Sequence, residues 1–175
     1  SITDEESETV ALIDIGAAKT SLNILRGATS LFMRDISMGC DQITRQIAAQ
    51  IDCPLDEAEQ IKTGKLKNKI SQEEHDDILS AFSTEWTTEV RRAFDFFYSS
   101  SGENDISRII LSGGGAHVEA LRDMLSTETE ASVETINPFG NLIINNSKFE
   151  PAFLEKIAPQ AAIALGLALR RVDDK

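Results

Sequence analysis

The sequence predicts an α/β domain on a mixed five-stranded sheet, with three antiparallel strands, two parallel strands and flanking helices. Three short apolar or alternating segments occupy the first 37 residues, and two later apolar segments, 106–112 and 132–136, lie among stretches with helical periodicity. The 175-residue length fits one domain, and 41% apolar residues with 26% charged residues are ordinary for a folded chain. We therefore expect a single hydrophobic core.

The first three strands are expected at 10–15, 20–25 and 31–37. The first of these runs is rich in β-branched residues and almost continuously apolar, and it ends at Gly16, as a buried strand does. A turn-rich stretch, 26–30, separates the second strand from the third. These segments predict an antiparallel meander.

Three helices are expected next. Apolar residues at helical spacing predict the first up to Ile51, and Pro54 ends it. The second spans 55–62, with acids in its early turns and a lysine near its end, which complements the helix dipole. Ser71 and Glu74 form a capping box ahead of the third and longest helix, and a loop is expected from Ser99. The residues expected in the core are Leu12, Ile13, Ile15, Phe82, Trp86, Phe94, Ile109, Leu111, Leu121 and Leu165.

The rest of the chain returns to the sheet. Strand 106–112 leads into Gly113–Gly115 and a helix, and strand 132–136 follows, with a further short strand considered at 142–144. Pro159 is expected to open the closing helix. Its core-facing residues are expected to be Ala162, Leu165, Ala168 and Leu169. This order is that of the ribonuclease H-like fold, which each half of actin-type nucleotide-binding proteins also uses.

Charge and composition exclude several functions. Seventeen basic and 29 acidic residues give a net charge of −12, which disfavours binding to a nucleic-acid backbone or an anionic membrane surface. A nuclease of this fold needs a second acid at the end of the fourth strand, where the chain has Leu111–Gly113. Cys40 and Cys53 match no zinc or redox spacing, and no apolar run approaches about 20 residues. We expect no nucleic-acid partner and no direct membrane insertion.

Two glycine-containing segments are candidates for a phosphate site. Asp14 stands at the end of a buried strand, Gly16 allows backbone amides to approach a phosphate, and Lys19 and Thr20 offer a charge and a hydroxyl. The acid would bind Mg²⁺ through water. Gly113–Gly115 would expose a helix N-terminus to a ligand. An ordinary strand-ending turn and close strand-to-helix packing are the alternatives for the two segments.

Taken in order, several segments resemble the second half of the PilM family, the actin-like cytoplasmic proteins of type IV pilus assembly. The matching segments are 11–25, 32–39, 58–62, 111–116, 137–139 and 164–170. The similarity extends over Val10–Arg171. FtsA, the actin-like cell-division protein, shares these elements, but its phosphate hairpin usually carries further glycines where this chain has Ala17 and Ala18.

The resemblance implies roles for individual residues. Asp14, Gly16, Lys19 and Thr20 correspond to the second phosphate hairpin, with Asp14 near a water-bound Mg²⁺. The remaining implied nucleotide-binding residues are Gly39 at the helix start facing the cleft, Glu59 and Lys62 beside the adenosine ribose, and Gly113, Gly114 and Gly115 as the adenosine loop. For Glu59 and Lys62 an ordinary solvated helix face is the alternative.

The resemblance also implies a domain organisation. An actin-like nucleotide-binding half would span 10–171, between an acidic linker at 1–9 and a tail at 172–175. Its core would comprise 10–54 and 105–171, with a helical subdomain inserted at about 55–104. The first half of the family's proteins, with its own phosphate loop, has no counterpart in these 175 residues.

The implied function is that of a nucleotide-binding scaffold. ATP with Mg²⁺ would bind to the intact two-half protein, with little or no hydrolysis, and weakly or not at all to this half. The scaffold would be cytoplasmic, peripheral to the inner membrane, and would link cytoplasmic motor components to inner-membrane pilus components. A PilN-like peptide would bind the missing half. An FtsA-like division protein and half of a sugar or acetate kinase are the alternatives.

Overall fold

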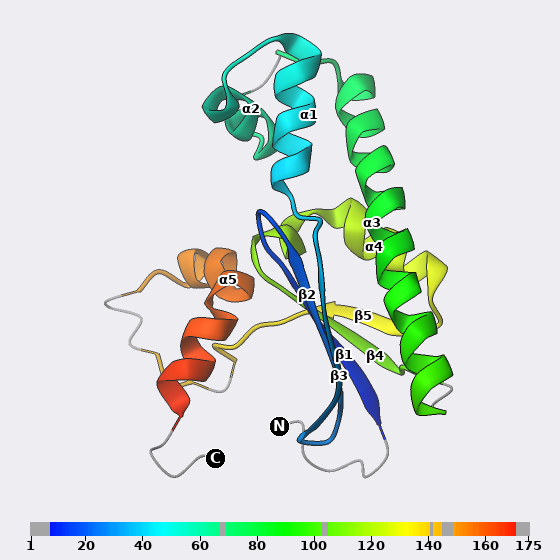
Figure 1. Ribbon diagram of the computed structural model, residues 1–175. Helices are drawn as coiled ribbons and strands as arrows, with labels where there is room; N and C mark the ends of the chain where they lie inside the picture. Colours follow the sequence, from blue (N-terminus) through cyan, green and yellow to red (C-terminus); the bar gives the residue numbers. More distant parts are fainter. Residues whose placement is uncertain (1–7, 67–68, 103–104, 141, 145–148, 171–175) are drawn as a thin grey trace.

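Figure 1 shows the computed structural model of the chain, which describes residues 8–66, 69–102, 105–140, 142–144 and 149–170. The expected linker and tail therefore lie largely outside the described residues. The elements are β1 (Thr9–Ile15), β2 (Thr20–Arg26), β3 (Thr29–Ile36), α1 (Asp41–Ile51), α2 (Leu55–Lys62), α3 (Gln72–Ser101), β4 (Arg108–Ser112), the 3₁₀ helix η1 (Gly114–His117), α4 (Glu119–Glu128), β5 (Ser132–Thr135) and α5 (Pro151–Leu169). The predicted α/β class and its five strands are confirmed.

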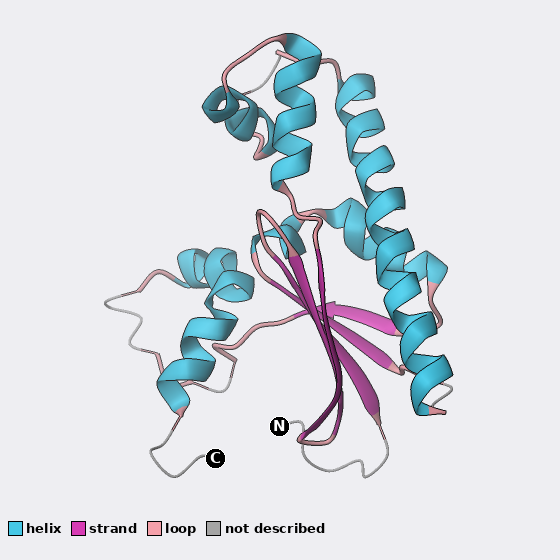
Figure 2. Cartoon of the chain, viewed as in Figure 1, coloured by secondary structure: helices cyan, strands magenta, loops and turns pink. Residues whose placement is uncertain are grey.

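The sheet has the strand order β3-β2-β1-β4-β5. The β1–β2 and β2–β3 pairs are antiparallel, whereas β4 runs parallel to both β1 and β5. Asp14 on the central strand lies between Ser21 of β2 and Ser112 of β4. Because parallel strands end at the same edge, the turn after β1 and the glycines after β4 meet there (Figure 2).

The core lies on one face of the sheet, under α3 and α4. Alternate residues of β1 point to this face, so Ile13 and Ile15 are buried while Leu12 points to the opposite face. Of the ten predicted core residues, Leu12 and Leu165 are the two exceptions: both are half-buried. Leu12 lies on the opposite face, where it lines a hollow together with Ala162 and Ile163 of α5, and Leu165 is a residue of α5 itself.

The helical elements match local sequence signals closely. The α2 bounds agree with prediction, and Ser71 and Glu74 form the capping box of α3. The α3 helix extends to Ser101 instead of giving way to a loop at Ser99. The hydroxyls of Ser99–Ser101 donate to carbonyls of the preceding turn, which accommodates three serines in the helix. Gly102 ends it with a φ of 71°.

The closing helix differs from prediction. It begins at Pro151, so Pro159 lies inside it rather than at its start. Pro151 suits the first turn, where an amide hydrogen has no intrahelical partner, whereas Pro159 costs the helix the hydrogen bond that an amide at this position would donate to the Glu155 carbonyl. The Pro159 carbonyl accepts a hydrogen bond from the Gly113 amide at 2.9 Å, which joins α5 to the end of β4. Ala168 and Leu169, predicted to face the core, are exposed. Residues 142–144 form no strand.

The α5 helix is, by length and composition, apolar enough to cross a membrane. Its mean hydropathy is 1.4 over an 18-residue window, of which 11% is buried. The sequence has no uninterrupted apolar run of this length because Glu155, Lys156 and Gln160 lie inside the segment, so only the helix as a whole reaches this hydropathy. This single helix is weak evidence for a span, because Ala158 and Pro159 are buried and the Gly113–Pro159 hydrogen bond joins α5 to the end of β4.

The exposed apolar side chains of α5 have a measurable consequence. Ile163 and Leu167 are 60% and 61% exposed and lie one turn apart on the same side of the helix. Replacing both by glutamate should reduce binding of an apolar dye to the chain without lowering its melting temperature. Leu55→Glu, at a 50% exposed position on α2, is the matched control. A fall of several degrees in the double variant would place these side chains in a core.

Candidate functional site

The β1–β2 turn is held by the start of α1. Its Gly16 amide donates to the Lys19 carbonyl at 2.9 Å, while the Gly16 and Ala17 carbonyls accept from the Cys40 and Asp41 amides. Ala17 and Ala18 are exposed. Within the described part of the chain, nothing accepts a hydrogen bond from the amides of these two alanines. The turn therefore offers two backbone donors to an anion.

Close backbone packing accounts for three of the predicted glycines. A Cβ at Gly39 would lie 2.3 Å from the Ala17 carbonyl oxygen, and one at Gly113, whose φ is +83°, would lie 2.5 Å from the Ile15 carbonyl oxygen. A Cβ at Gly115 would meet the Ile15 side chain at 2.2 Å. Gly114 is exposed, so it is the glycine of this loop that a ligand can approach.

Thr20 is turned into the core. Its side chain is completely buried, its hydroxyl donates to the Met38 carbonyl at 2.9 Å, and it accepts from Trp86 Nε1 at 2.9 Å. Both bonding directions are thus used within the protein. This arrangement joins the base of the β1–β2 turn to α3.

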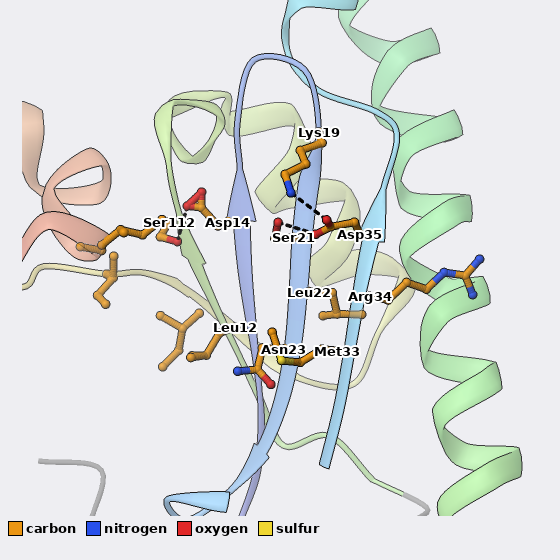
Figure 3. Close-up of a pocket in the computed structure, with 14 residues that line it drawn as sticks. Leu12, Asp14, Lys19, Ser21, Leu22, Asn23, Met33, Arg34, Asp35 and Ser112 are labelled. Carbon is orange, nitrogen blue, oxygen red and sulfur yellow. Dashed lines mark hydrogen bonds and ion pairs between the residues drawn. The ribbon is translucent and has the colours of Figure 1, made fainter. Parts of the chain in front are cut away.

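Asp14 and Lys19 line a hollow of about 820 Å³ on the open face of the sheet, which we call the sheet-face hollow (Figure 3). Ser112 donates to Asp14 Oδ2 at 3.3 Å, and Lys19 Nζ lies 2.7 Å from Asp35 Oδ2. Hydrogen bonds from Lys19 and Ser21 lower the pKa of Asp35. A single open carboxylate fits Mg²⁺, which is often bound through one carboxylate together with waters and phosphate oxygens.

Glu59 and Lys62 form an ion pair on α2, with their charged atoms 2.6 Å apart. Thr44 of α1 lies between them: its hydroxyl donates to Glu59 Oε2 at 2.7 Å and accepts from Lys62 Nζ at 2.9 Å. Burial raises the pKa of Glu59, but the hydrogen bonds from Lys62 and Thr44 outweigh it and lower that pKa below its ordinary value. The carboxylate is therefore ionised at neutral pH.

This ion pair borders a second hollow of about 590 Å³, the α2–α5 hollow, which lies between α2, the β1–β2 turn, η1 and α5. Lys62, Lys65 and Lys156 line it together with one acid, Glu59. In a chain of net charge −12, this is a local excess of positive charge. The hollow is therefore suited to an anionic ligand.

The predicted site residues fall into two groups around the β1–β2 turn. Gly16, Glu59, Lys62, Gly114 and Gly115 line the α2–α5 hollow, whereas Asp14 and Lys19 line the sheet-face hollow. Sequence reasoning missed the following residues of the α2–α5 hollow: Lys65, His117, Lys156 and Gln160. The spacing of Lys156 and Gln160 places them on one side of α5, but only once that helix is known to begin before Pro159.

The two cysteines should differ in reactivity. Burial raises the pKa of the Cys40 thiol to about 11, and Cys40 is only 6% exposed beside the α2–α5 hollow. Because the thiolate is the reactive form, Cys40 should resist iodoacetamide at pH 8 in the native chain while the more accessible Cys53 reacts. Mass spectrometry of modified peptides, with urea-unfolded chain as control, measures this. Equal modification of both thiols in the native chain would contradict the burial of Cys40.

The sheet order, the turn after β1 and the glycine loop after β4 together fit an α/β actin-like fold. A family model for "Type IV pilus assembly protein PilM" matches residues 2–172. The chain belongs to this family.

Solved structures agree with this assignment. The chain is 29% identical to a protein of a "PilM-PilN type IV pilus biogenesis complex", with a TM-score of 0.85 over 99% of this chain and 48% of that one. Ethanolamine utilization protein EutJ from Carboxydothermus hydrogenoformans is 17% identical, with a TM-score of 0.63 over 96% of this chain and 50% of that one. MreB 5 of Spiroplasma citri, solved with AMPPNP, is also 17% identical, with a TM-score of 0.60 over 91% and 56%. The chain thus spans about half the length of these proteins, and the last two show the fold alone.

Proposed function

We propose that this chain is the nucleotide-binding half of a cytoplasmic scaffold for type IV pilus assembly, and that ATP with Mg²⁺ binds when a second half completes the cleft. The single observation that supports this best is the α2–α5 hollow, a positively charged hollow in an acidic chain that opens beside the unbonded amides of the β1–β2 turn. In domain terms, 10–171 would be the actin-like half, with a helical insertion at about 55–104, although α3 within that range packs on the sheet and shares its core.

Different described residues would contact the base, the ribose, the phosphates and the metal ion of the bound nucleotide. Gly114 and the α5 side chains Lys156 and Gln160 would contact the base, and Glu59 the ribose. The amides of Ala17 and Ala18 would receive the phosphates. Bound Mg²⁺ would neutralise phosphate charge, and Asp14 would orient its water ligands from the other side of the turn. No described residue of this half would contact the terminal phosphate from a second side, so we propose binding with little or no hydrolysis.

The partners are proposed from the family. One solved relative is described as part of a PilM-PilN complex, and we propose that a PilN-like peptide binds to the half that this chain lacks. The whole protein would reach the inner membrane through such partners rather than by inserting α5, and would link them to cytoplasmic motor components. Deleting the gene in its own organism should abolish surface pili and twitching, and the intact gene should restore them. Normal piliation after deletion would contradict the proposed role.

Asp14 provides a test of the Mg²⁺ assignment. In a protein that joins this chain to its second half, Asp14→Ala should weaken ATP binding about tenfold when Mg²⁺ is present and little in EDTA, because only a water-mediated contact to the ion is lost. Asp35→Ala, on the same hollow, is the matched control and should retain the Mg²⁺ dependence. Calorimetry with and without Mg²⁺ measures both. Wild-type affinity of Asp14→Ala in Mg²⁺ would remove Asp14 from the site.

A further inference from the structure

A further hollow, of about 500 Å³, lies between α3 and α4, and we call it the α3–α4 groove. The two helices pack against each other on the core side of the sheet (Figure 1), and the Arg91–Glu128 ion pair joins them at 2.6 Å. Each helix lines the groove with four residues at positions i, i+3, i+4 and i+7, between 76 and 83 on α3 and between 120 and 127 on α4. The groove is therefore bounded by one face of each helix.

The lining of the groove is partly apolar and adaptable. Leu79 of α3 and Ala120 and Met124 of α4 are half-buried there. The unbranched side chain of Met124 can adjust to the shape of an incoming group. A groove between two helices with such a lining fits a third helix that presents apolar side chains at the same spacing.

The groove carries negative charge on both sides. Asp76 of α3 and Asp123 of α4 line it, and their side chains are 61% and 68% exposed. Among the described ion pairs, Asp123 has only its chain neighbour Arg122, and Asp76 has only the adjacent His75 imidazole. Because α3 and α4 together hold ten acidic residues and three arginines, this surface attracts basic groups.

Ser83 adds a polar group to the groove. Its side chain is completely buried, and its hydroxyl has no hydrogen-bond partner among the described residues. A buried hydroxyl without a partner destabilises a fold, and alanine favours helix over serine, so stability alone does not account for a serine here. A donor from a bound partner would satisfy this hydroxyl. Thr87, one turn further along α3, also has a buried hydroxyl without a described partner, but it does not line the groove.

We propose that the α3–α4 groove is a docking site for a basic amphipathic helix of a partner protein. Its apolar side chains would cover Leu79 and Met124, its lysines or arginines would pair with Asp76 and Asp123, and one donor would reach the Ser83 hydroxyl. A second copy of the chain, with net charge −12, does not match this charge, and neither does segment 1–7, which has three acids and no basic residue. The groove shares no lining residue with the other two hollows, so the inference is independent of nucleotide binding.

The probe for this site is a synthetic helical peptide of about 14 residues, or four turns, with leucines at i, i+3, i+4 and i+7 and lysines beside them. Titrated into the isotope-labelled chain, it should shift the amides of 76–83 and 120–127 most strongly. Binding should weaken as salt is raised. A peptide with the same leucines and glutamate in place of each lysine should not bind.

Charge variants separate the groove from the overall charge of the chain. Asp76→Asn combined with Asp123→Asn should weaken binding of the basic peptide about tenfold, because two exposed charge pairs are lost. Asp95→Asn combined with Glu130→Gln removes the same charge at exposed positions outside the groove, so this matched control should stay close to wild-type affinity. Equal weakening by the two double variants would mean that the peptide senses net charge alone, and it overturns the inference.

Ser83 provides a readout that net charge does not move. Ser83→Ala should raise the melting temperature of the free chain, because an unsatisfied buried hydroxyl is removed, and yet weaken peptide binding about tenfold. Thr87→Val removes the other such hydroxyl and should keep wild-type affinity. Undiminished binding by Ser83→Ala, binding of the acidic peptide, shifts mainly outside the groove, or no shifts at about millimolar basic peptide each overturn the inference.

Discussion

Replacing Trp86 by alanine should lower the free energy of unfolding by about 3–5 kcal/mol, the cost of truncating a fully buried tryptophan. The indole is completely buried in α3 and donates to Thr20, whose hydroxyl in turn donates to the Met38 carbonyl. The substitution therefore opens a cavity and removes the bond that joins α3 to the base of the β1–β2 turn. Urea unfolding followed by circular dichroism measures the loss.

Two further variants separate the stability cost of the cavity from that of the lost hydrogen bond. Trp86→Phe keeps much of the packing but loses the donor to Thr20, so it should cost less than Trp86→Ala. Phe96→Ala truncates an aromatic residue on the same helix that is 55% exposed, and it should cost about 1 kcal/mol or less. If Trp86→Ala costs no more than Phe96→Ala, α3 does not pack on the sheet as described.

Gly39→Ala should be the second most damaging single change, at about 2–3 kcal/mol, because an added Cβ would meet backbone rather than a flexible side chain. The new atom would lie 2.3 Å from the Ala17 carbonyl oxygen and 2.7 Å from the Lys19 amide nitrogen. The β1–β2 turn would have to move away from α1. We therefore expect weaker nucleotide binding as well as lower stability.

The matched control is Gly166→Ala on α5. Nothing lies within 4 Å of a Cβ at this position, and alanine favours helix over glycine by about 1 kcal/mol, so this variant should be neutral or more stable. Both variants are compared by thermal unfolding and by nucleotide titration. A Gly39→Ala chain as stable as Gly166→Ala would mean that the turn is not packed against the start of α1.

Elements set by neighbouring residues were predictable from sequence. The α2 bounds follow from Pro54 and its charge pattern, and the start of α3 follows from its capping box. The start of α5 was not, because Pro151 and Pro159 both favour a first turn locally and the segment alone does not indicate which of them begins the helix. The contact that joins Pro159 to the end of β4 comes from the Gly113 amide, 46 residues earlier in the chain.

In the candidate site too, features set by neighbouring residues were predictable and features set by distant contacts were not. Spacing along the chain identified the β1–β2 turn and the glycine loop, but not the directions in which side chains point. Lys19 is paired with Asp35 on the third strand, Thr20 is bonded by Trp86 from 66 residues away, and Thr44 stands between Glu59 and Lys62. Such contacts depend on the register of the sheet and on helix packing, for which a single sequence has no local signal.

Entry of a nucleoside into the α2–α5 hollow is tested most directly by titrating the isotope-labelled chain with MgATP. We expect the largest amide shifts at the β1–β2 turn amides of Ala17 and Ala18, which would receive the phosphates, and at the following residues that line the hollow: Glu59, Lys62, Gly114, Gly115, His117, Lys156, Ile157 and Gln160. Affinity should be no tighter than about millimolar, or roughly 4 kcal/mol, because the chain has net charge −12 and spans only half of its relatives. ATP turnover should stay at background. If these residues show no shifts at MgATP concentrations up to about ten times the millimolar dissociation constant, or if saturating shifts occur only elsewhere, nucleotide does not bind in this hollow. Saturation at micromolar MgATP, or ATP turnover above background, would show that the site is complete within these 175 residues.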